Sequence, residues 1–415
     1  MAKHYLKRLA ISALLVGLLG TLPAAAMDPA KAPKPNDPNC KNTGSFERWL
    51  DEFRKEARAS GVSNATIASA LGGMTLDPGI ISRDRKQGFF AQTFSAFSGK
   101  LISQNRITNG TARLKQHRDL FAKAEKDHGV PGPIIAAFWA LESDFGVGMG
   151  NLPVLRSLAT LAYDCRRPEL FRGELMAALK IIDRGDLTPE EMIGSWAGEL
   201  GQTQFLPTHY LAHAEDYDGD GRRNLLTSVA DVIGSTAAFI QHLGWERGQP
   251  WLQEVRVPGN LPWDQADLAI QHPRSKWVSL GVTAVQGNLP ADNLPASLLL
   301  PMGRFGPAFL AYPNFQVYPK WNQSLNYAIT AAHLATRLAG APAMTKPATP
   351  IPELSPEQSK ELQQLLTRRG FFDGEIDGKI GAATRAGVKK AQMKLGVAAD
   401  SYPTPELLER LRAAR

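Results

Sequence analysis

Long apolar runs are absent from this sequence beyond its first two dozen residues, which excludes a protein built from several membrane-spanning helices. At the start, Lys3, Lys7 and Arg8 precede an apolar run from Leu9 to Leu22. Ala24-Ala25-Ala26 follows and supplies the small side chains that a signal peptidase requires. Residues 1–26 are therefore predicted to be a removable secretory signal. A retained membrane anchor is the alternative, although the run is short for a bilayer span.

Cysteine is scarce, with only Cys40 and Cys165 in 415 residues. Because no cysteine stands at the expected cleavage point, a lipoprotein anchor is not expected. Both cysteines remain after cleavage, and export to the bacterial periplasm would permit them to form a disulfide. The sequence does not show whether their Cα atoms lie close enough to pair.

The sequence also lacks a large excess of positive or of negative charge. Loss of residues 1–26 removes three positive charges, so the formal net charge falls from +7 to +4. Mild basicity suits an acidic polymer, and export argues against nucleic acid as that polymer. No long repeat is present, and the length suits two or three globular domains.

Helical periodicity extends over most of the chain. Phe46, Trp49, Leu50 and Phe53 share one helical face, after a Pro-rich and Lys-rich stretch that predicts a disordered leader over residues 27–44. Further helices are expected over residues 67–71, 88–97, 114–124, 168–184, 228–243 and 321–338.

Between Trp251 and Tyr318 the pattern changes. Short β-prone runs alternate with Pro/Gly turns at residues 254–257, 297–300, 308–311 and 316–318. This region is expected to form a small mixed insertion within a mostly helical domain over residues 45–340.

A Pro-rich stretch over residues 341–354 predicts a semi-extended linker. Residues 355–415 then predict a compact module, whose first helix opens with a capping box formed by Ser355 and Gln358.

Glu142 stands near the end of the most informative helix. Ile135, Phe138 and Trp139 precede it by seven, four and three positions, so they share its helical face. A carboxylate among apolar side chains is costly to bury as an anion, so its pKa should rise. A raised pKa is what a general acid working near neutral pH requires. Gly146 and the two alternate glycines after it would let the chain bend around the carboxylate.

The helix pattern alone favours a plainer interpretation, in which Glu142 pairs with a nearby arginine. The run Ala140-Leu-Glu-Ser-Asp-Phe-Gly146, however, resembles the signature of the membrane-bound lytic transglycosylase B family. Three further segments resemble motifs of that family in the same order: Ser195-Trp-Ala-Gly-Glu-Leu-Gly-Gln-Thr-Gln204-Phe-Leu-Pro-Thr, Asp216-Tyr-Asp-Gly-Asp-Gly-Arg222 and Trp321-Asn-Gln-Ser-Leu-Asn-Tyr327-Ala. The resemblance covers almost all of the domain before the linker.

This resemblance implies a mainly α, lysozyme-like catalytic domain that cleaves the β-1,4 bond between N-acetylmuramic acid and N-acetylglucosamine. Ordinary glycosidases use two carboxylates, whereas the resemblance implies one. Glu142 would protonate the linking oxygen and then take the proton of the muramyl C6 hydroxyl as it closes onto C1, giving a 1,6-anhydromuramyl end. The substrate's own 2-acetamido group would stabilise the positive charge. Asp144 points away from Glu142 and is interpreted as a surface or capping residue.

Two other functions stay open. A hydrolysing muramidase on the same fold would need a second carboxylate within reach of Glu142, and none of the matched segments is interpreted as supplying one. A non-catalytic peptidoglycan-binding scaffold would tolerate loss of the acid, and the intact motif around Glu142 argues against it.

By the same resemblance, Ser195 and Gln204 line the sugar cleft, and Asn322 and Tyr327 contact the sugar near the scissile bond. The alternative for the loop with Ser195 and Gln204 is a glycine-rich turn with buried polar side chains. Trp321 stands where the family commonly has Tyr, which removes a hydroxyl but keeps a ring able to stack on a sugar.

Arg166 and Arg167 follow Cys165 at a position where the family often has two arginines. They could bind a carboxylate of the substrate's stem peptide through bidentate hydrogen bonds. A solvated pair of arginines is the alternative.

Asp216, Asp218 and Asp220 occupy positions 1, 3 and 5 of an EF-hand-like loop, in which Arg222 supplies a backbone carbonyl and Thr227 stands at position 12. Carboxylates this close repel one another unless a cation lies between them, and Ca²⁺ suits an all-oxygen ligand set. Because Thr227 replaces the usual bidentate Glu, a weak structural Ca²⁺ site is expected, which Asp231 could complete. An Asx-rich turn without metal is the alternative. No cofactor is expected to be required for the chemistry.

The C-terminal residues resemble the three-helix peptidoglycan-binding domain of cell-wall hydrolases, above all in Asp377-Gly378…Gly381-x-x-Thr384-Arg385. On a Pro-rich tether, such a module would be mobile and would raise the effective substrate concentration. The alternative is a small helical domain docked on the catalytic body, with no ligand of its own. The expected partners are peptidoglycan glycan strands and proteins of cell-wall synthesis or hydrolysis, not nucleic acid, for a periplasmic monomer.

Overall fold

A computed structural model of the chain describes residues 42, 44–85 and 92–414. The predicted signal, Cys40 and most of the predicted leader lie outside the described residues, as does part of the helix expected over 88–97. In the part of the chain that is described, no helix is both long and apolar enough to cross a membrane.

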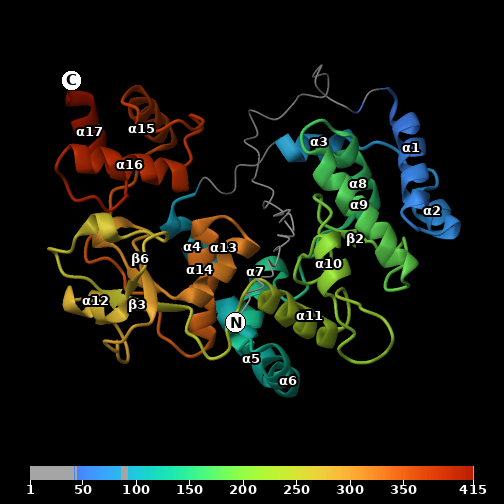
Figure 1. Cartoon of the computed structure of the whole chain (residues 1–415), viewed down its shortest axis with the longest axis horizontal. Coiled ribbons are helices and arrows are strands. Elements are labelled where there is room, and N and C mark those ends of the chain that lie inside the picture. The colour runs from blue at the N-terminus through green and yellow to red at the C-terminus, as the bar shows by residue number, and fades with distance from the viewer. Residues whose placement is uncertain (1–41, 43, 86–91, 415) are drawn as a thin grey trace, which may run out of the picture.

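The described part is mostly helical, and Figure 1 shows a helical body, a sheet to one side of it and a C-terminal helical module above the sheet. The helices of the body are α1 (Phe46–Ala59), α2 (Asn64–Leu71), α3 (Pro78–Arg85), α4 (Phe94–Leu101), α5 (Gln104–Gln116), α6 (Arg118–His128), α7 (Gly132–Ser143), α8 (Val154–Tyr163), α9 (Pro168–Asp183), α10 (Pro207–His213), α11 (Val229–His242), α13 (Val317–Trp321) and α14 (Leu325–Leu338). A short ribbon, β1 (Leu152–Pro153) with β2 (Ile193–Gly194), joins two of its loops.

Helix α7 lies at the centre of this body. Its residues from Ile134 to Ala140 are all fully buried, because the helix is apolar on every side and packs against α5, α6, α11 and α14. Glu142 lies in the last turn of α7, where the apolar surroundings end. The sequence of α7 therefore dictates both its central position and the half-buried position of its one carboxylate.

The insertion expected between Trp251 and Tyr318 is confirmed. It forms an antiparallel sheet in the order β4-β6-β7-β3-β5, from β3 (Leu252–Arg256), β4 (His272–Pro273), β5 (Thr283–Ala284), β6 (Pro295–Leu299) and β7 (Ala308–Ala311), with the short helix α12 (Arg274–Ser279) and the 3₁₀ turns η2 (Trp263–Gln265) and η3 (Gly303–Phe305). Trp277 and the inner strand residues close a separate apolar core beneath it.

Three sequence predictions of local structure are wrong. Residues 316–318 are helical, because Pro313 starts the 3₁₀ turn η4 (Pro313–Gln316) and α13 continues it, with Val317 and Tyr318 buried in the main core. The helix expected over 114–124 is interrupted at His117, which has non-helical backbone angles between α5 and α6. The helix expected over 321–338 is interrupted as well, between the end of α13 at Trp321 and the start of α14 at Leu325.

The C-terminal module consists of α15 (Pro356–Arg368), α16 (Ala382–Lys394) and α17 (Pro405–Ala413), and its predicted capping box is present at Ser355 and Gln358. In Figure 1 the module lies beside the sheet, on the far side of the body from α1 and α2. The Arg385 guanidinium donates hydrogen bonds to the carbonyls of Leu300 (2.6 Å) and Pro301 (3.1 Å). The module is therefore docked on the preceding domain, which is the docking that the alternative interpretation of this segment expected.

Candidate active site

The carboxyl group of Glu142 is held by side chains from two other helices. Its Oε1 accepts a hydrogen bond from the indole N–H of Trp321 at 2.9 Å and another from the hydroxyl of Tyr327. The break between α13 and α14 makes this possible, because Asn322 leaves the helix with extended backbone angles and Ser324 caps the next one. The interruption that the sequence did not predict thus turns two donors toward the same oxygen.

Burial raises the pKa of Glu142 to about 7, and the nearby negative charge of Glu199 adds to the rise, whereas the hydrogen bonds from Tyr327 and Trp321 oppose it. Among the described residues, no arginine pairs with Glu142. Arg106 instead binds Asp144, with its Nε 2.5 Å from Oδ1. Asp144 is the exposed C-cap of α7, as expected from the sequence, and the plainer interpretation of Glu142 as one half of an ion pair is wrong.

The chain after Glu142 turns through a run of left-handed residues that ends at Gly146, with φ of 92°. A Cβ atom on Gly146 would lie 2.6 Å from Oε1 of Gln202, so only glycine fits. Gln202 accepts the indole N–H of Trp139 at 2.8 Å, and its carbonyl accepts the hydroxyl of Ser143 at 2.5 Å. These contacts join the end of α7 to the loop over residues 195–206.

That loop carries two of the residues expected at the site. The Ser195 hydroxyl donates to Oε2 of Glu199 at 2.9 Å and accepts the backbone N–H groups of Ala197 and Glu199. Gln204, which has φ of 51°, donates from Nε2 to the carbonyls of Gly201 (2.9 Å) and Met149 (3.2 Å). Both side chains are half-buried and organise the loop beside Glu142.

Glu199 is a candidate functional residue that the sequence interpretation missed. It is half-buried; burial raises its pKa, and the Ser195 hydroxyl and the charge of Arg167 oppose that rise. Its charge also raises the pKa of Glu142, so one of the matched segments does carry a second carboxyl group that influences Glu142. The signal was present, since Glu199 lies within the loop motif between two glycines.

The remaining sugar-contact candidates have structural partners. Asn322 accepts the backbone N–H of Ser324 through Oδ1 at 3.0 Å. The Trp321 ring stacks on Phe138 with centroids 4.2 Å apart, so one of its faces is covered. Trp321 therefore contributes its indole N–H, as a hydrogen-bond donor to Glu142, as well as its ring.

The two arginines expected to bind a stem peptide differ in exposure. Arg166 is buried, with 4% of its side chain exposed, and its guanidinium binds Asp84. It is therefore not accessible to a ligand, and this part of the prediction is wrong. Arg167 also binds Asp84, at 2.7 Å, but keeps 22% of its side chain exposed and lies close enough to Glu199 to favour the ionised form of that carboxyl.

Cys165, which precedes the two arginines, is in a disulfide bond. The partner that the sequence suggests, Cys40, lies outside the described residues.

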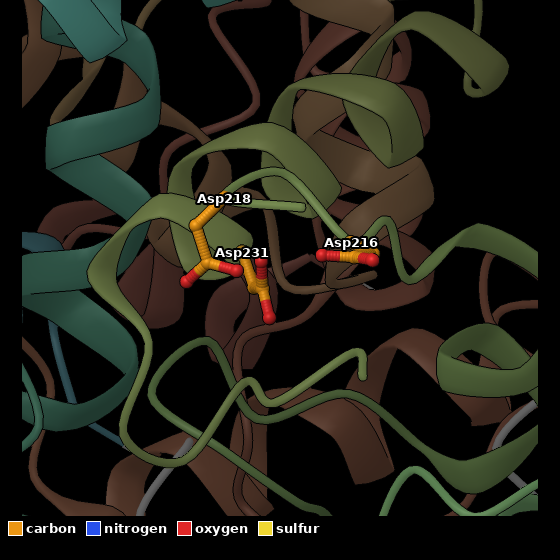
Figure 2. A group of neighbouring side chains, drawn as sticks. All are labelled: Asp216, Asp218 and Asp231. Atoms are coloured by element: carbon orange, nitrogen blue, oxygen red, sulfur yellow. The ribbon is translucent and has the colours of Figure 1, made fainter. Parts of the chain in front are cut away.

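The acidic loop brings together a different set from the one expected. Carboxylate oxygens of Asp216, Asp218 and Asp231 lie within 4.8 Å of one another, as Figure 2 shows, whereas Asp220 is not part of this group. The oxygens already have donors: Asp231 accepts the backbone N–H groups of Tyr217 and Asn224, both at 2.7 Å. Asp216 accepts three backbone N–H groups, and Asp218 accepts the Ser228 hydroxyl at 2.6 Å.

An all-oxygen set of this kind fits Ca²⁺ in chemistry. Of the predicted carboxylate ligands, only Asp220 lies outside the group. The Asp220 carboxylate accepts the backbone N–H of Arg222 at 2.8 Å, and the Arg222 side chain binds Glu191. The buried Asp231, which the sequence suggested could complete the site, is the third member of the group.

Comparison with known proteins identifies the family of this chain. Residues 45–336 match the transglycosylase SLT domain family, and the chain belongs to that family. Residues 355–411 match a peptidoglycan binding domain family. The family resemblance and the fold class predicted from the sequence are thereby confirmed.

Over 243 residues the chain is 32% identical to Membrane-bound lytic murein transglycosylase B of Escherichia coli (strain K12). This alignment covers 58% of the chain and 66% of the relative, slightly less than two thirds of the relative's length.

Two solved structures are similar over most of their length. The crystal structure of SltB3 from Pseudomonas aeruginosa in complex with NAG-anhNAM-pentapeptide is 42% identical, has a TM-score of 0.83, and the match covers 89% of this chain and 100% of that one. The structure of the Escherichia coli lytic transglycosylase Slt35 in complex with calcium is 26% identical, with a TM-score of 0.61 and coverage of 75% and 98%.

Proposed function

We propose that this chain is a lytic murein transglycosylase that cleaves the β-1,4 bond between N-acetylmuramic acid and N-acetylglucosamine in peptidoglycan and leaves a 1,6-anhydromuramyl end. The observation that carries the proposal is the environment of Glu142. Its carboxyl is half-buried, has a pKa of about 7 and is held by two neutral donors instead of a cation. Such a group is protonated often enough to act as an acid and ionises easily enough to act as a base near neutral pH.

In the first step, Glu142 transfers its proton to the glycosidic oxygen, and the bond between that oxygen and C1 of the muramyl residue breaks, with its electron pair going to the oxygen. The N-acetylglucosamine portion leaves as an alcohol. The 2-acetamido group of the substrate stabilises the positive charge at C1. Trp321 and Tyr327 then stabilise the carboxylate formed on Glu142, because both donate to its Oε1.

In the second step, the muramyl C6 hydroxyl attacks C1, and Glu142 takes its proton. A new C6–O–C1 bond forms, the acid is regenerated and no water is consumed. The ligand named with SltB3, NAG-anhNAM-pentapeptide, has the anhydro group that this step would produce.

The test is the replacement Glu142→Gln, which keeps the shape of the side chain but removes the proton donor. We expect release of soluble muropeptides from purified sacculi to fall by about three orders of magnitude or more, while sacculus binding is unchanged. Glu52→Gln, on the exposed surface of α1 beside Lys55, is the matched control. Release of anhydromuropeptides by the Glu142→Gln variant at the normal rate would refute the assignment.

Hydrolysis of the same bond is the second candidate, because Glu199 places another carboxylate near Glu142 and two carboxylates are the usual equipment of a glycosidase. Mass spectrometry of the digest separates the two reactions. Anhydro ends support the transglycosylase, reducing muramyl ends support the muramidase, and absence of soluble products supports a non-catalytic scaffold.

We also propose a weak structural Ca²⁺ site at Asp216, Asp218 and Asp231, away from the chemistry. A cation there would have to displace backbone N–H donors, so its affinity should be low. Millimolar CaCl₂ should raise the melting temperature by about 2–4 °C relative to EGTA, and Asp218→Asn should abolish this rise. An equal rise in the Asp218→Asn variant would contradict the site.

Finally, we propose that the chain is exported to the periplasm after removal of residues 1–26 and acts there as a monomer on glycan strands, alongside other proteins of cell-wall synthesis or hydrolysis. N-terminal sequencing of the exported protein tests the cleavage point, and an uncleaved N-terminus would contradict it.

A further inference from the structure

The side chain of Gln202 is buried between the end of the helix that carries Glu142 and the segment that precedes α11. It is 8% exposed and has no part in the two chemical steps proposed above. A buried amide is costly unless its oxygen and its N–H groups have hydrogen-bond partners. The partners of Gln202 therefore indicate which parts of the chain it holds together.

Two hydrogen bonds tie Gln202 to the last turn of α7. Its Oε1 accepts the indole N–H of Trp139 at 2.8 Å, and its backbone carbonyl accepts the hydroxyl of Ser143 at 2.5 Å. Both partners are buried. Trp139 precedes Glu142 by three positions and Ser143 follows it directly, so the two contacts lie on either side of Glu142 in the chain.

The Ser143 hydroxyl extends this contact to the chain after the helix. It accepts the backbone N–H of Gly146 at 2.8 Å while it donates to Gln202. A hydroxyl that donates and accepts at once is fixed in its orientation. The end of α7 and the first turn of the loop after it are therefore held together at one point.

On its other side, Gln202 is bound to backbone carbonyls. Its backbone N–H donates to the carbonyl of Leu225 at 2.9 Å, and its Nε2 donates to the carbonyl of Leu226 at 2.9 Å. The segment that contains these carbonyls is attached to α11, because Asp231 accepts the backbone N–H of Asn224 at 2.7 Å. Gln202 thus connects the end of α7 to a segment that α11 holds in place.

We propose that Gln202 is a positioning residue of the reaction: it fixes the last turn of α7 and thereby keeps the Glu142 carboxyl against its two hydrogen-bond donors. This inference rests on the proposed function. Among the described residues, Gln202 has no hydrogen bond to Glu142 and acts through Trp139 and Ser143. Such a role matters because a displacement of about 1 Å at a reacting group can lower a rate about a hundredfold.

A role in packing alone predicts a different result. The donors of Glu142, Trp321 and Tyr327, come from α13 and α14, to which Gln202 makes no hydrogen bond in the described part of the chain. If Gln202 only filled the core, its replacement would lower stability and leave these bonds as they are. A change in the bond between Trp321 and Glu142 would instead report a movement of Glu142.

Gln202→Met is the first variant, because it keeps the length of the side chain and removes both hydrogen bonds of the amide. In ¹H–¹⁵N spectra of the full chain, the indole N–H resonance of Trp139 should move, and that of Trp321 should move with it. Trp139→Phe and Trp321→Phe identify the two resonances among the eight tryptophans. This readout needs no substrate, so it decides the inference even if the proposed activity fails. A shift at Trp139 alone would overturn the proposal.

Activity on sacculi gives the second measurement. In Gln202→Met, kcat should fall about tenfold to a hundredfold while KM changes less than about twofold, because the acid is misplaced and the sugar contacts remain. Gln363→Met in α15 is the matched control, since its buried amide also donates to two side chains, those of Asp377 and Thr384. It should lower stability and leave kcat and the Trp321 resonance unchanged. An equal fall of kcat in both variants would contradict a positioning role.

Gln202→Glu separates the two hydrogen bonds of the amide and replaces Gln202→Met if that variant does not fold. An ionised carboxyl can accept the Trp139 N–H but cannot donate to the carbonyl of Leu226, whereas a protonated carboxyl can do both. Burial raises the pKa of a carboxyl. The kcat of this variant, relative to the native protein at the same pH, should therefore recover as the pH is lowered from 8 to 5. A constant ratio over this range would count against the proposal.

Discussion

The surroundings of Glu142 suit this one side chain to both of the roles proposed for it, acid and base. Apolar packing from α7 removes water from the carboxyl and raises its pKa, and the Tyr327 and Trp321 donors limit that rise. Either effect alone would give a group fixed in one protonation state. Their balance gives a pKa of about 7, at which protonation and ionisation cost similar free energy.

A pH profile follows from this balance. Because the first step needs protonated Glu142, kcat/KM on peptidoglycan should decline above pH of about 7, where the carboxyl ionises. An ordinary glutamate would put this decline more than two units lower. Turbidity loss of sacculi between pH 5 and 9 measures it, and a rate that keeps rising through pH 8 would contradict the assignment.

Tyr327 offers a second test at the level of a single residue. Tyr327→Phe removes a hydrogen bond that lowers the pKa of Glu142, so the alkaline decline should move to higher pH. The rate at the optimum should fall about tenfold, because the carboxylate formed in the first step loses a donor. Tyr318→Phe is the matched control: the buried Tyr318 hydroxyl has no hydrogen-bond partner among the described residues, so its loss should not reduce activity or stability. Equal losses in both variants would indicate a packing effect only.

At the scale of elements, the site depends on where helices end. The end of α7 delivers Glu142, and the break between α13 and α14 delivers Trp321 and Tyr327 to the same oxygen. The loop after α7 then returns against the loop over residues 195–206, and Gln202 is the contact that both share. The proposed acid and its two hydrogen-bond donors therefore all lie where helices end or begin, and the helices hold these ends in place.

Gly146 tests this dependence. Gly146→Ala should lower the free energy of unfolding by about 1–3 kcal/mol, because alanine is strained at positive φ and its Cβ would press on Gln202. Activity should fall by more than the loss of stability accounts for, because displacement of the loop at Gly146 would also displace Ser143 and Glu142. Gly148→Ala is the matched control: its Cβ would lie 3.5 Å from the nearest atom, so it should change stability by less than about 0.5 kcal/mol. Chemical denaturation of both variants measures the difference, and equal effects would refute this explanation.

On the scale of the whole molecule, the C-terminal module is joined to the insertion by polar contacts at several points. Besides the two bonds from Arg385, Asp400 accepts the backbone N–H of Arg304 at 3.0 Å, and Lys389 pairs with Asp267 at 3.2 Å. A cavity of about 670 Å³ lies between the module, the linker and η3. The arginine of the module's signature therefore holds the module on the catalytic body, so the linker does not act as a free tether.

Arg385→Met should weaken this docking, because the carbonyls of Leu300 and Pro301 lose their donor while the length of the side chain is kept. We expect limited proteolysis within residues 341–354 to become about tenfold faster. Lys390→Met, an exposed position on the same helix, is the control and should be cleaved at the native rate. Identical cleavage of both variants would show that Arg385 does not hold the interface.

The sequence by itself determined the family, the helical class and the insertion, and it singled out Glu142 as the proposed acid, because these follow from motifs and from local periodicity. It also placed Ser195, Gln204 and Tyr327 near the site, since a resemblance in order and spacing carries their positions. Motifs and helical periodicity involve residues that are close together in the chain, so they can be recognised in the sequence without knowledge of the fold.

Only the tertiary structure decided which partner each polar group takes. It buried Arg166 against Asp84, turned the Trp321 indole onto Glu142 and brought Glu199 close enough for its charge to raise the pKa of Glu142. These pairings join segments far apart in the chain. Their energies depend on distance and burial in the folded state, so no local pattern in the sequence reveals them.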